Sequence, residues 1–214
     1  AADDLRDGHA SYYLALAESS DSELRGPGQA EALRRFASER EDLRVAFERL
    51  LERDPPAALR LVAALWVFWF MSGHFREGRE LLAAALERAP SEPTEARASA
   101  LVGAGLLADE QGEHGESRGL LEDGLADARA AGSARMEVHA LSLLSFYDAF
   151  GRDEQIRLGE EAITNARTSG DRWLLGLVTG NHGVLMAKFG EFEKAIELTD
   201  EAYRLCRGVG DVSL

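Results

Sequence analysis

The chain of 214 residues carries 24 lysines and arginines against 38 aspartates and glutamates, a formal net charge of −14 at pH 7. A surface of that charge repels phosphate backbones and anionic lipids, so we expect no direct binding to nucleic acid or to a membrane. No apolar run approaches the roughly 18 residues of a membrane-spanning helix, and the single cysteine, Cys206, excludes an internal disulfide and fits a reducing cytoplasm.

Residues 1–54 predict a short helical adapter. Residues 2–19 have the spacing of a first helix of moderate amphipathicity, and the Gly-Pro-Gly at 26–28 is a clear break before a second helix. The segment 41–52 places four apolar residues on one helix face at i, i+3, i+4 and i+7: Leu43, Ala46, Phe47 and Leu50. Two prolines then end this helix and can open the next one, since proline is tolerated in a first turn.

From residue 55 onwards a pattern recurs with a fixed period. Gly73, Gly112, Gly151 and Gly190 are 39 residues apart, and each closes a helical, apolar run. Such a period is typical of a stacked array whose units cannot bury their cores alone. It predicts an all-α array of helix pairs over residues 55–214, with about eleven helices in the chain. The units cover about 58–89, 97–131, 134–169 and 172–209, with repeat helices starting near 58, 75, 97, 115, 134, 153, 172 and 192.

The segment 61–71, LVAALWVFWFM, is apolar almost all round. A helix without a polar face is expected to be buried. We therefore expect the helix of Trp66 and Trp69 to be the most buried element, joining the adapter to the array. At the other end, we expect the last helix to leave an apolar face partly exposed, formed by Ile196, Leu198, Tyr203 and Leu205.

The repeat units resemble tetratricopeptide (TPR) repeats. The last unit matches through Gly183, Met186, the turn Gly190-Glu191-Phe192, Ala195 and Ala202. The third unit matches least, because Asp153 stands in the place of the turn aromatic and Gln155 in the place of the first alanine. The turn after Gly151 is also one residue shorter than in the other units. The period of 39 exceeds the usual 34, which is similar to kinesin-light-chain-like variants. The resemblance implies a right-handed superhelical array whose inner face is lined by the first helix of each unit.

A second resemblance lies in the order of the parts. The adapter followed by ALRLVAALWVFWFMSGHFREGRELLAAALERAP is similar to the LuxR-type and antibiotic-regulator-type signalling ATPases of the STAND class. This resemblance implies a cytoplasmic bacterial transcriptional regulator in which the array is the sensor region. It also implies a P-loop ATPase and a DNA-binding domain elsewhere in a longer protein, of which we expect this chain to be a fragment. The 214 residues contain no GxxxxGK[ST] motif.

The sequence offers no pattern for catalysis or metal binding. The five histidines show no metal-ligand spacing, and no nucleophile elbow is present. We therefore expect no enzyme, no metal site and no cofactor in this fragment. His182 stands where the repeat has a core leucine, so we expect a partly buried histidine with a hydrogen bond rather than a ligand site.

Candidate binding residues come from the inner face. Three positions before the turn glycines stand Phe70, Asp109 and Asp148, so we expect the two aspartates to share one concave surface and to favour a cationic ligand. The full candidate set is Phe70, Leu106, Asp109, Glu110, Asp148, Asn181 and Lys188. Two functions remain open. The first is a non-catalytic sensor domain that binds a protein, a peptide or a small inducer in the groove. The second is a self-association scaffold that forms a homodimer through the ends of the array.

Overall fold

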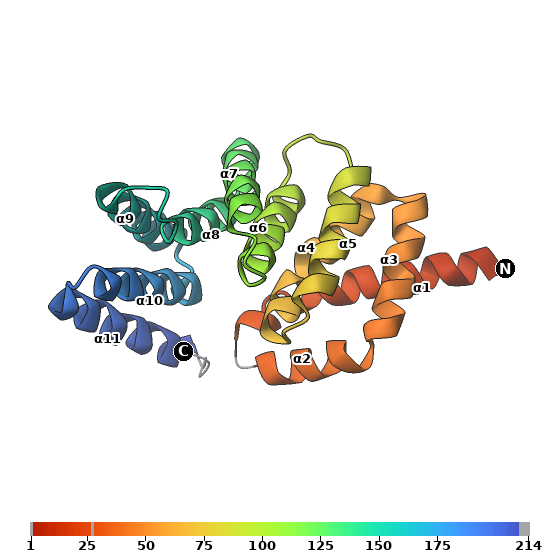
Figure 1. Cartoon of the computed structure of the whole chain (residues 1–214). Coiled ribbons are helices and arrows are strands. Elements are labelled where there is room, and N and C mark those ends of the chain that lie inside the picture. Colours follow the sequence, from red (N-terminus) through yellow and green to blue (C-terminus); the bar gives the residue numbers. More distant parts are fainter. Residues whose placement is uncertain (1, 27, 210–214) are drawn as a thin grey trace.

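The computed structural model describes residues 2–26 and 28–209, which form an all-α array without a strand (Figure 1). The helices are α1 (Ala2–Ser20), a 3-10 turn η1 (Glu23–Arg25), α2 (Gln29–Ser38), α3 (Arg40–Arg53), α4 (Pro55–Met71), α5 (Phe75–Arg88), α6 (Glu95–Asp109), α7 (His114–Ala131), α8 (Ala134–Leu144), α9 (Arg152–Ser169), α10 (Arg172–Lys188) and α11 (Phe192–Val209). The predicted fold class is confirmed, and the eight repeat helices start within three residues of the predicted positions.

Four helix pairs follow one another from α4–α5 to α10–α11 (Figure 1). Three of the pairs turn at a glycine with a left-handed backbone, Gly73, Gly112 and Gly190, whose φ angles are 70°, 81° and 81°. Glycine adopts this conformation without steric cost. The residue after each of these glycines donates its N–H to a carbonyl five positions back, which satisfies the end of the first helix. The need for a left-handed backbone at these turns therefore explains why glycine recurs there in the 39-residue period.

The third pair differs from the prediction. Gly151 has a φ of −64° and caps the start of α9, while α8 already ends at Leu144. Gln155 gives a physical reason. In the other pairs the corresponding position is a small residue, whereas the buried Gln155 side chain donates from Nε2 to the backbone oxygen of Tyr147, 2.5 Å away. This bond supports an irregular turn over residues 145–151 in place of another helical turn.

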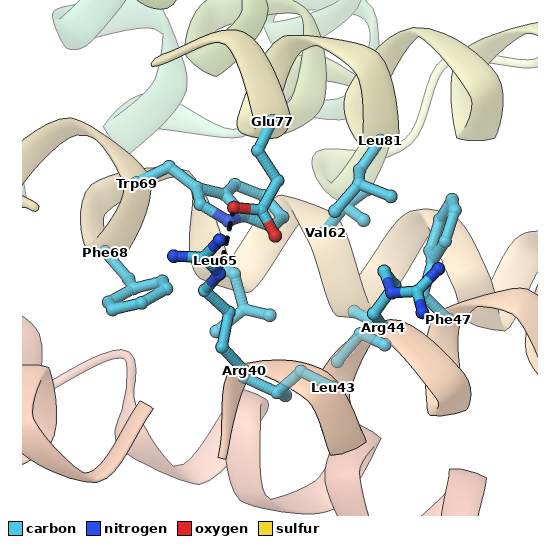
Figure 2. Close-up of a pocket in the computed structure, with 11 residues that line it drawn as sticks. Arg40, Leu43, Arg44, Phe47, Val62, Leu65, Phe68, Trp69, Glu77 and Leu81 are labelled. Carbon is cyan, nitrogen blue, oxygen red and sulfur yellow. Dashed lines mark ion pairs between the residues drawn. The ribbon is translucent and has the colours of Figure 1, made fainter. Parts of the chain in front are cut away.

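The adapter and the first repeat share one hydrophobic core, centred on α4. Eleven residues of α4 are buried, Phe36 of α2 packs against Phe68 with ring centroids 5.7 Å apart, and Trp69 is 3% exposed. Figure 2 shows this junction, where Phe68 and Trp69 lie beside the ion pair between Arg40 Nε and Glu77 Oε2 (3.2 Å). The space left here is about 10 Å³, room for a water molecule at most. The expectation of a buried hub is therefore confirmed, whereas the domain boundary at residue 54 remains a prediction.

Small residues allow the repeat helices to approach closely. A Cβ atom at Gly103 of α6 would lie 2.6 Å from two side-chain carbons of Trp66, and one at Gly78 of α5 would lie 2.6 Å from Leu107 Cδ1. Non-bonded carbon atoms prefer about 3.5–4.0 Å. The glycines of these helices therefore have a packing role, which outweighs the roughly 1 kcal/mol that glycine costs inside a helix.

The last helix leaves an apolar face exposed, as expected. Phe192 is 66% exposed, Ile196 63% and Tyr203 52%, while Leu198 and Leu205 are half-buried. Within residues 2–26 and 28–209, no helix combines the length and apolarity that crossing a bilayer requires.

Candidate ligand-binding groove

The first helices of all four repeats line a groove of about 370 Å³. This volume falls within the usual range for small-molecule sites, roughly 300–1,000 Å³. The lining is Trp66, Val67, Phe70 and Met71 from α4, Leu106, Asp109 and Glu110 from α6 and its end, His139, Ser142 and Leu143 from α8, Phe146 and Tyr147 from the turn after α8, Trp173, Leu177 and Asn181 from α10, together with Leu121 of α7 and Gln29 of α2. The groove is therefore mainly apolar and aromatic, with its acidic groups at one end.

Five of the seven predicted site residues lie in this lining: Phe70, Leu106, Asp109, Glu110 and Asn181. The other two, Asp148 and Lys188, do not. The expectation that Asp109 and Asp148 hold equivalent positions on one concave surface is wrong, because α8 ends before residue 148. Asp148 lies in the turn with its side chain 85% exposed, and its Oδ1 accepts a hydrogen bond from Lys188 Nζ (2.5 Å). Lys188 holds the pKa of Asp148 below its usual value.

Tyr147, rather than the predicted Asp148, lies at the acidic end of the groove. Its hydroxyl donates to Asp109 Oδ1 over 2.9 Å and also contacts the buried hydroxyl of Ser117. His114 Nδ1 lies 2.8 Å from the same Asp109 oxygen. Burial, together with the negative charge of Asp109, raises the pKa of Tyr147 to about 12, so the phenol stays protonated and remains a donor at neutral pH. These contacts fix the orientation of the Asp109 carboxylate.

His139 lies in the lining between two tryptophans. Its ring centroid is 5.7 Å from Trp66 in an edge-on arrangement and 6.3 Å from Trp173. Burial, together with the positive charges of Arg135 and Arg25, lowers the pKa of His139 to about 3, so the imidazole is neutral at pH 7. The side chain is 5% exposed, and its Nε2 has no hydrogen-bond partner among residues 2–26 and 28–209. A buried, unpaired polar atom costs about 1–3 kcal/mol, which suggests that this site is not selected for stability alone.

The remaining polar residues of the groove are acceptors or already paired. Asn181 Nδ2 donates to Ser142 Oγ over 3.1 Å. The two residues are 39 positions apart, so this bond joins equivalent positions of neighbouring repeats. The amide oxygen of Asn181 makes no further hydrogen bond within the described part of the chain, which leaves an acceptor at this wall.

The environment of His182 differs from the prediction. It is 2% exposed rather than partly buried, and neither ring nitrogen has a hydrogen-bond partner among residues 2–26 and 28–209. It packs on Gly159 of α9, where a Cβ atom would lie 2.2 Å from its Nδ1. Burial lowers the pKa of His182, so it is a neutral core residue. It lies outside the lining of the groove.

Sequence reasoning missed the aromatic residues that dominate the lining. Trp66 was assigned only to the core, while His139, Phe146, Tyr147 and Trp173 were not selected. One available signal was the shortened turn after Gly151, which distinguishes this unit from the other three. The other residues carry no local signal, because only the stacking of α4, α8 and α10 brings them together.

The geometry defines a TPR-like helical repeat fold, and comparison with solved structures agrees. The crystal structure of BtubC (BKLC) from P. vanneervenii matches with a TM-score of 0.65 and 16% identity, covering 100% of this chain and 94% of that one. Two structures of a Podosopora anserina putative kinesin light chain with nearly identical TPR-like repeats have TM-scores of 0.60 and 0.58 at 14% and 16% identity. Each covers 92% of this chain, and the matches span 94% and 95% of those chains. No protein-family profile and no curated protein matches the sequence.

Proposed function

We propose that this chain is a non-catalytic binding module that recognises a protein segment, a peptide or a small inducer in the groove between α4, α6, α8 and α10. The carrying observation is the groove itself, about 370 Å³ lined by aromatic side chains with a few polar groups, which is the usual composition of a ligand site. TPR-like repeat folds generally present such concave surfaces to partners. The site requires no cofactor.

The sequence resemblance to LuxR-type STAND regulators supplies the context of this proposal. In that context the chain is the cytoplasmic sensor region of a bacterial transcriptional regulator, and ligand binding in the groove controls the ATPase. The sequence of the surrounding gene tests this part directly. We expect a P-loop motif in the preceding region, and its absence would remove the regulator assignment while leaving the binding module intact.

The binding role is tested by selecting ligands on the protein and asking where they bind. A phage-displayed peptide library and a fragment library are selected on the wild type. Each ligand is then titrated against Leu177→Trp, which fills the groove, and Val184→Trp, which adds the same side chain to an exposed position of the same helix. We expect a loss of at least about tenfold, or 1.4 kcal/mol, for the first variant only. Ligands that bind both variants equally would place the binding surface elsewhere.

A second candidate function is self-association through the end of the array. It is favoured by the exposed face of α11, where Phe192, Ile196 and Tyr203 are each more than half exposed. Contiguous apolar surface of this kind is common at interaction sites. Light scattering after size exclusion, over a range of concentrations, tests the idea with Ile196→Glu. A wild type that dimerises and a monomeric variant would support it, whereas a monomeric wild type would exclude it.

A further inference from the structure

The acidic end of the groove coincides with the ends of three helices. Helices α4, α6 and α8 each contribute residues at or just after their carboxyl ends to the lining, and α4 and α8 both pack against α6. They end at Met71, Asp109 and Leu144. A helix carries a partial negative charge at its carboxyl end, which favours nearby cations. The backbone therefore adds to the negative potential of the side chains at this end.

The charged side chains at this end of the groove are also negative. Asp109 and Glu110 are the charged residues in the lining, which contains no lysine or arginine within the described residues. Both contacts to Asp109, from Tyr147 and His114, use Oδ1, so Oδ2 can accept a further hydrogen bond. Glu110 is exposed and forms no ion pair with any residue in the described part of the chain. This end of the groove thus combines negative charge with unused acceptors.

The rest of the groove suits an apolar ring. Trp66, Phe70 and Trp173 contribute aromatic surface. A cation close to the rings of Trp66 or Phe70 is also attracted by their negative faces, whereas the Arg25 guanidinium already lies 5.9 Å from the centroid of the Trp173 ring. His139 is neutral at pH 7 and adds no positive charge of its own, although the charges of Arg135 and Arg25 act on it. This residue of the lining carries a buried polar atom without a partner in the described part of the chain, which is a second, independent sign of a ligand.

We propose that the groove binds a small apolar amine, with its ring among Trp66, Phe70 and Trp173 and its ammonium group beside Asp109 and Glu110. This inference rests on the proposed function and names the ligand class for the same site. A small molecule fits better than an extended peptide, because a peptide backbone needs hydrogen-bond partners along its length. Here the amide nitrogen of Asn181 is already used by Ser142, and most of the lining is apolar.

Three indoles that differ in charge provide the test: tryptamine, tryptophol and indole-3-acetate. They share one ring system and carry an ammonium, a hydroxyl and a carboxylate group. Binding is measured at low salt by saturation-transfer difference NMR and by amide chemical shifts. We expect tryptamine to bind about tenfold more tightly than indole-3-acetate, with tryptophol between them. High salt reduces this difference, since the Debye length shortens to about 3 Å near 1 M.

Two double variants distinguish the effect of the groove carboxylates from the effect of the net charge of the protein. Asp109→Asn/Glu110→Gln removes the two groove carboxylates, and Glu87→Gln/Glu92→Gln removes two exposed carboxylates outside the groove. Glu110→Gln alone leaves the contacts of Asp109 intact. We expect the preference for tryptamine to disappear in the first double variant, to weaken in the single variant and to persist in the second double variant.

The outcomes distinguish this inference from the proposed function. Equal binding of all three indoles, abolished by Leu177→Trp, would overturn the amine preference and leave the groove as a binding site. Binding of selected peptides but of none of the indoles would also overturn it and favour a protein segment as the ligand. Loss of preference in both double variants would assign the effect to net charge and overturn the assigned site.

Discussion

The indole nitrogen of Trp66 donates a hydrogen bond to Ser99 Oγ over 3.1 Å, joining α4 to α6 inside the protein. The serine hydroxyl donates in turn to the backbone oxygen of Ala63, 2.9 Å away. Both side chains are buried, and Trp66 also lines the groove. This short chain of hydrogen bonds therefore connects the packing of two neighbouring repeats to the orientation of an aromatic ring in the candidate binding site.

Ser99→Ala should destabilise the protein. The substitution leaves the Trp66 N–H buried without an acceptor, and such an unpaired group costs about 1–3 kcal/mol. Chemical denaturation followed by circular dichroism measures the change in the free energy of unfolding. Ser11→Ala, at an exposed position, is the matched control and should change it by less than about 0.5 kcal/mol. A similar small change for Ser99→Ala would show that the bond contributes little.

Two glycine-to-alanine substitutions should have opposite effects. Gly103→Ala places a methyl group 2.6 Å from Trp66 and should cost about 1–3 kcal/mol, as overpacking does. Gly119→Ala, inside α7, adds a methyl group with no atom within 4 Å and should stabilise by about 0.5–1 kcal/mol. Thermal melting of both variants provides the measurement. If both substitutions stabilise, Trp66 can move aside and the close approach of α4 and α6 has no energetic importance.

His139 should make the protein less stable in mild acid. Its pKa is lowered from 6.5 to about 3 in the folded chain by burial, so between these values only the unfolded state binds the proton. Stability therefore falls as pH decreases below about 6.5, at up to about 1.4 kcal/mol per pH unit. Between about pH 7.5 and pH 5, the free energy of unfolding should fall less in His139→Phe than in wild type. The expected difference is on the order of 1–2 kcal/mol.

The comparison requires denaturation at about pH 7.5 and pH 5 for each variant. Burial also lowers the pKa of His182, so the stability of His139→Phe should still depend on pH. Ser11→Ala, at an exposed position, provides the control substitution. Identical pH dependence in wild type and His139→Phe would show that folding does not lower the pKa of His139.

Asp171→Ala should weaken the start of α10, the helix that contributes Trp173 to the groove. The Asp171 carboxylate accepts the N–H of Leu174 over 3.0 Å, and loss of such a cap costs about 0.5–2 kcal/mol. Asp171→Ser should restore most of the loss, since serine is also a good capping residue. Hydrogen exchange of the first turn of α10 measures the effect locally. Unchanged exchange in the alanine variant would contradict the capping role.

Much of the fold could be read from the sequence because its signals are local. Glycines such as Gly73 and Gly190 adopt a left-handed backbone that other residues rarely adopt, and apolar residues at helical spacing define the buried faces between them. Neither signal depends on distant residues. The helix boundaries, the buried helix of Trp69 and the exposed face of Ile196 were therefore predictable.

The groove was predictable only in part. Phe70, Leu106 and Asp109 follow the 39-residue register and lie where the register places them. Asp148 does not, because the side chain of Gln155 supports an irregular turn, and helical periodicity contains no information about such a contact.

By itself, the sequence determined which segments are helices and that they pair in a repeating order. Only the tertiary structure decided that Trp66, His139 and Trp173 share one site, although they lie on three different repeats. The physical reason is that backbone propensities act within a few residues, whereas the rotation of one helix pair on the next depends on interlocking side chains. At Gly103, for example, the absence of a single methyl group sets how closely Trp66 can approach.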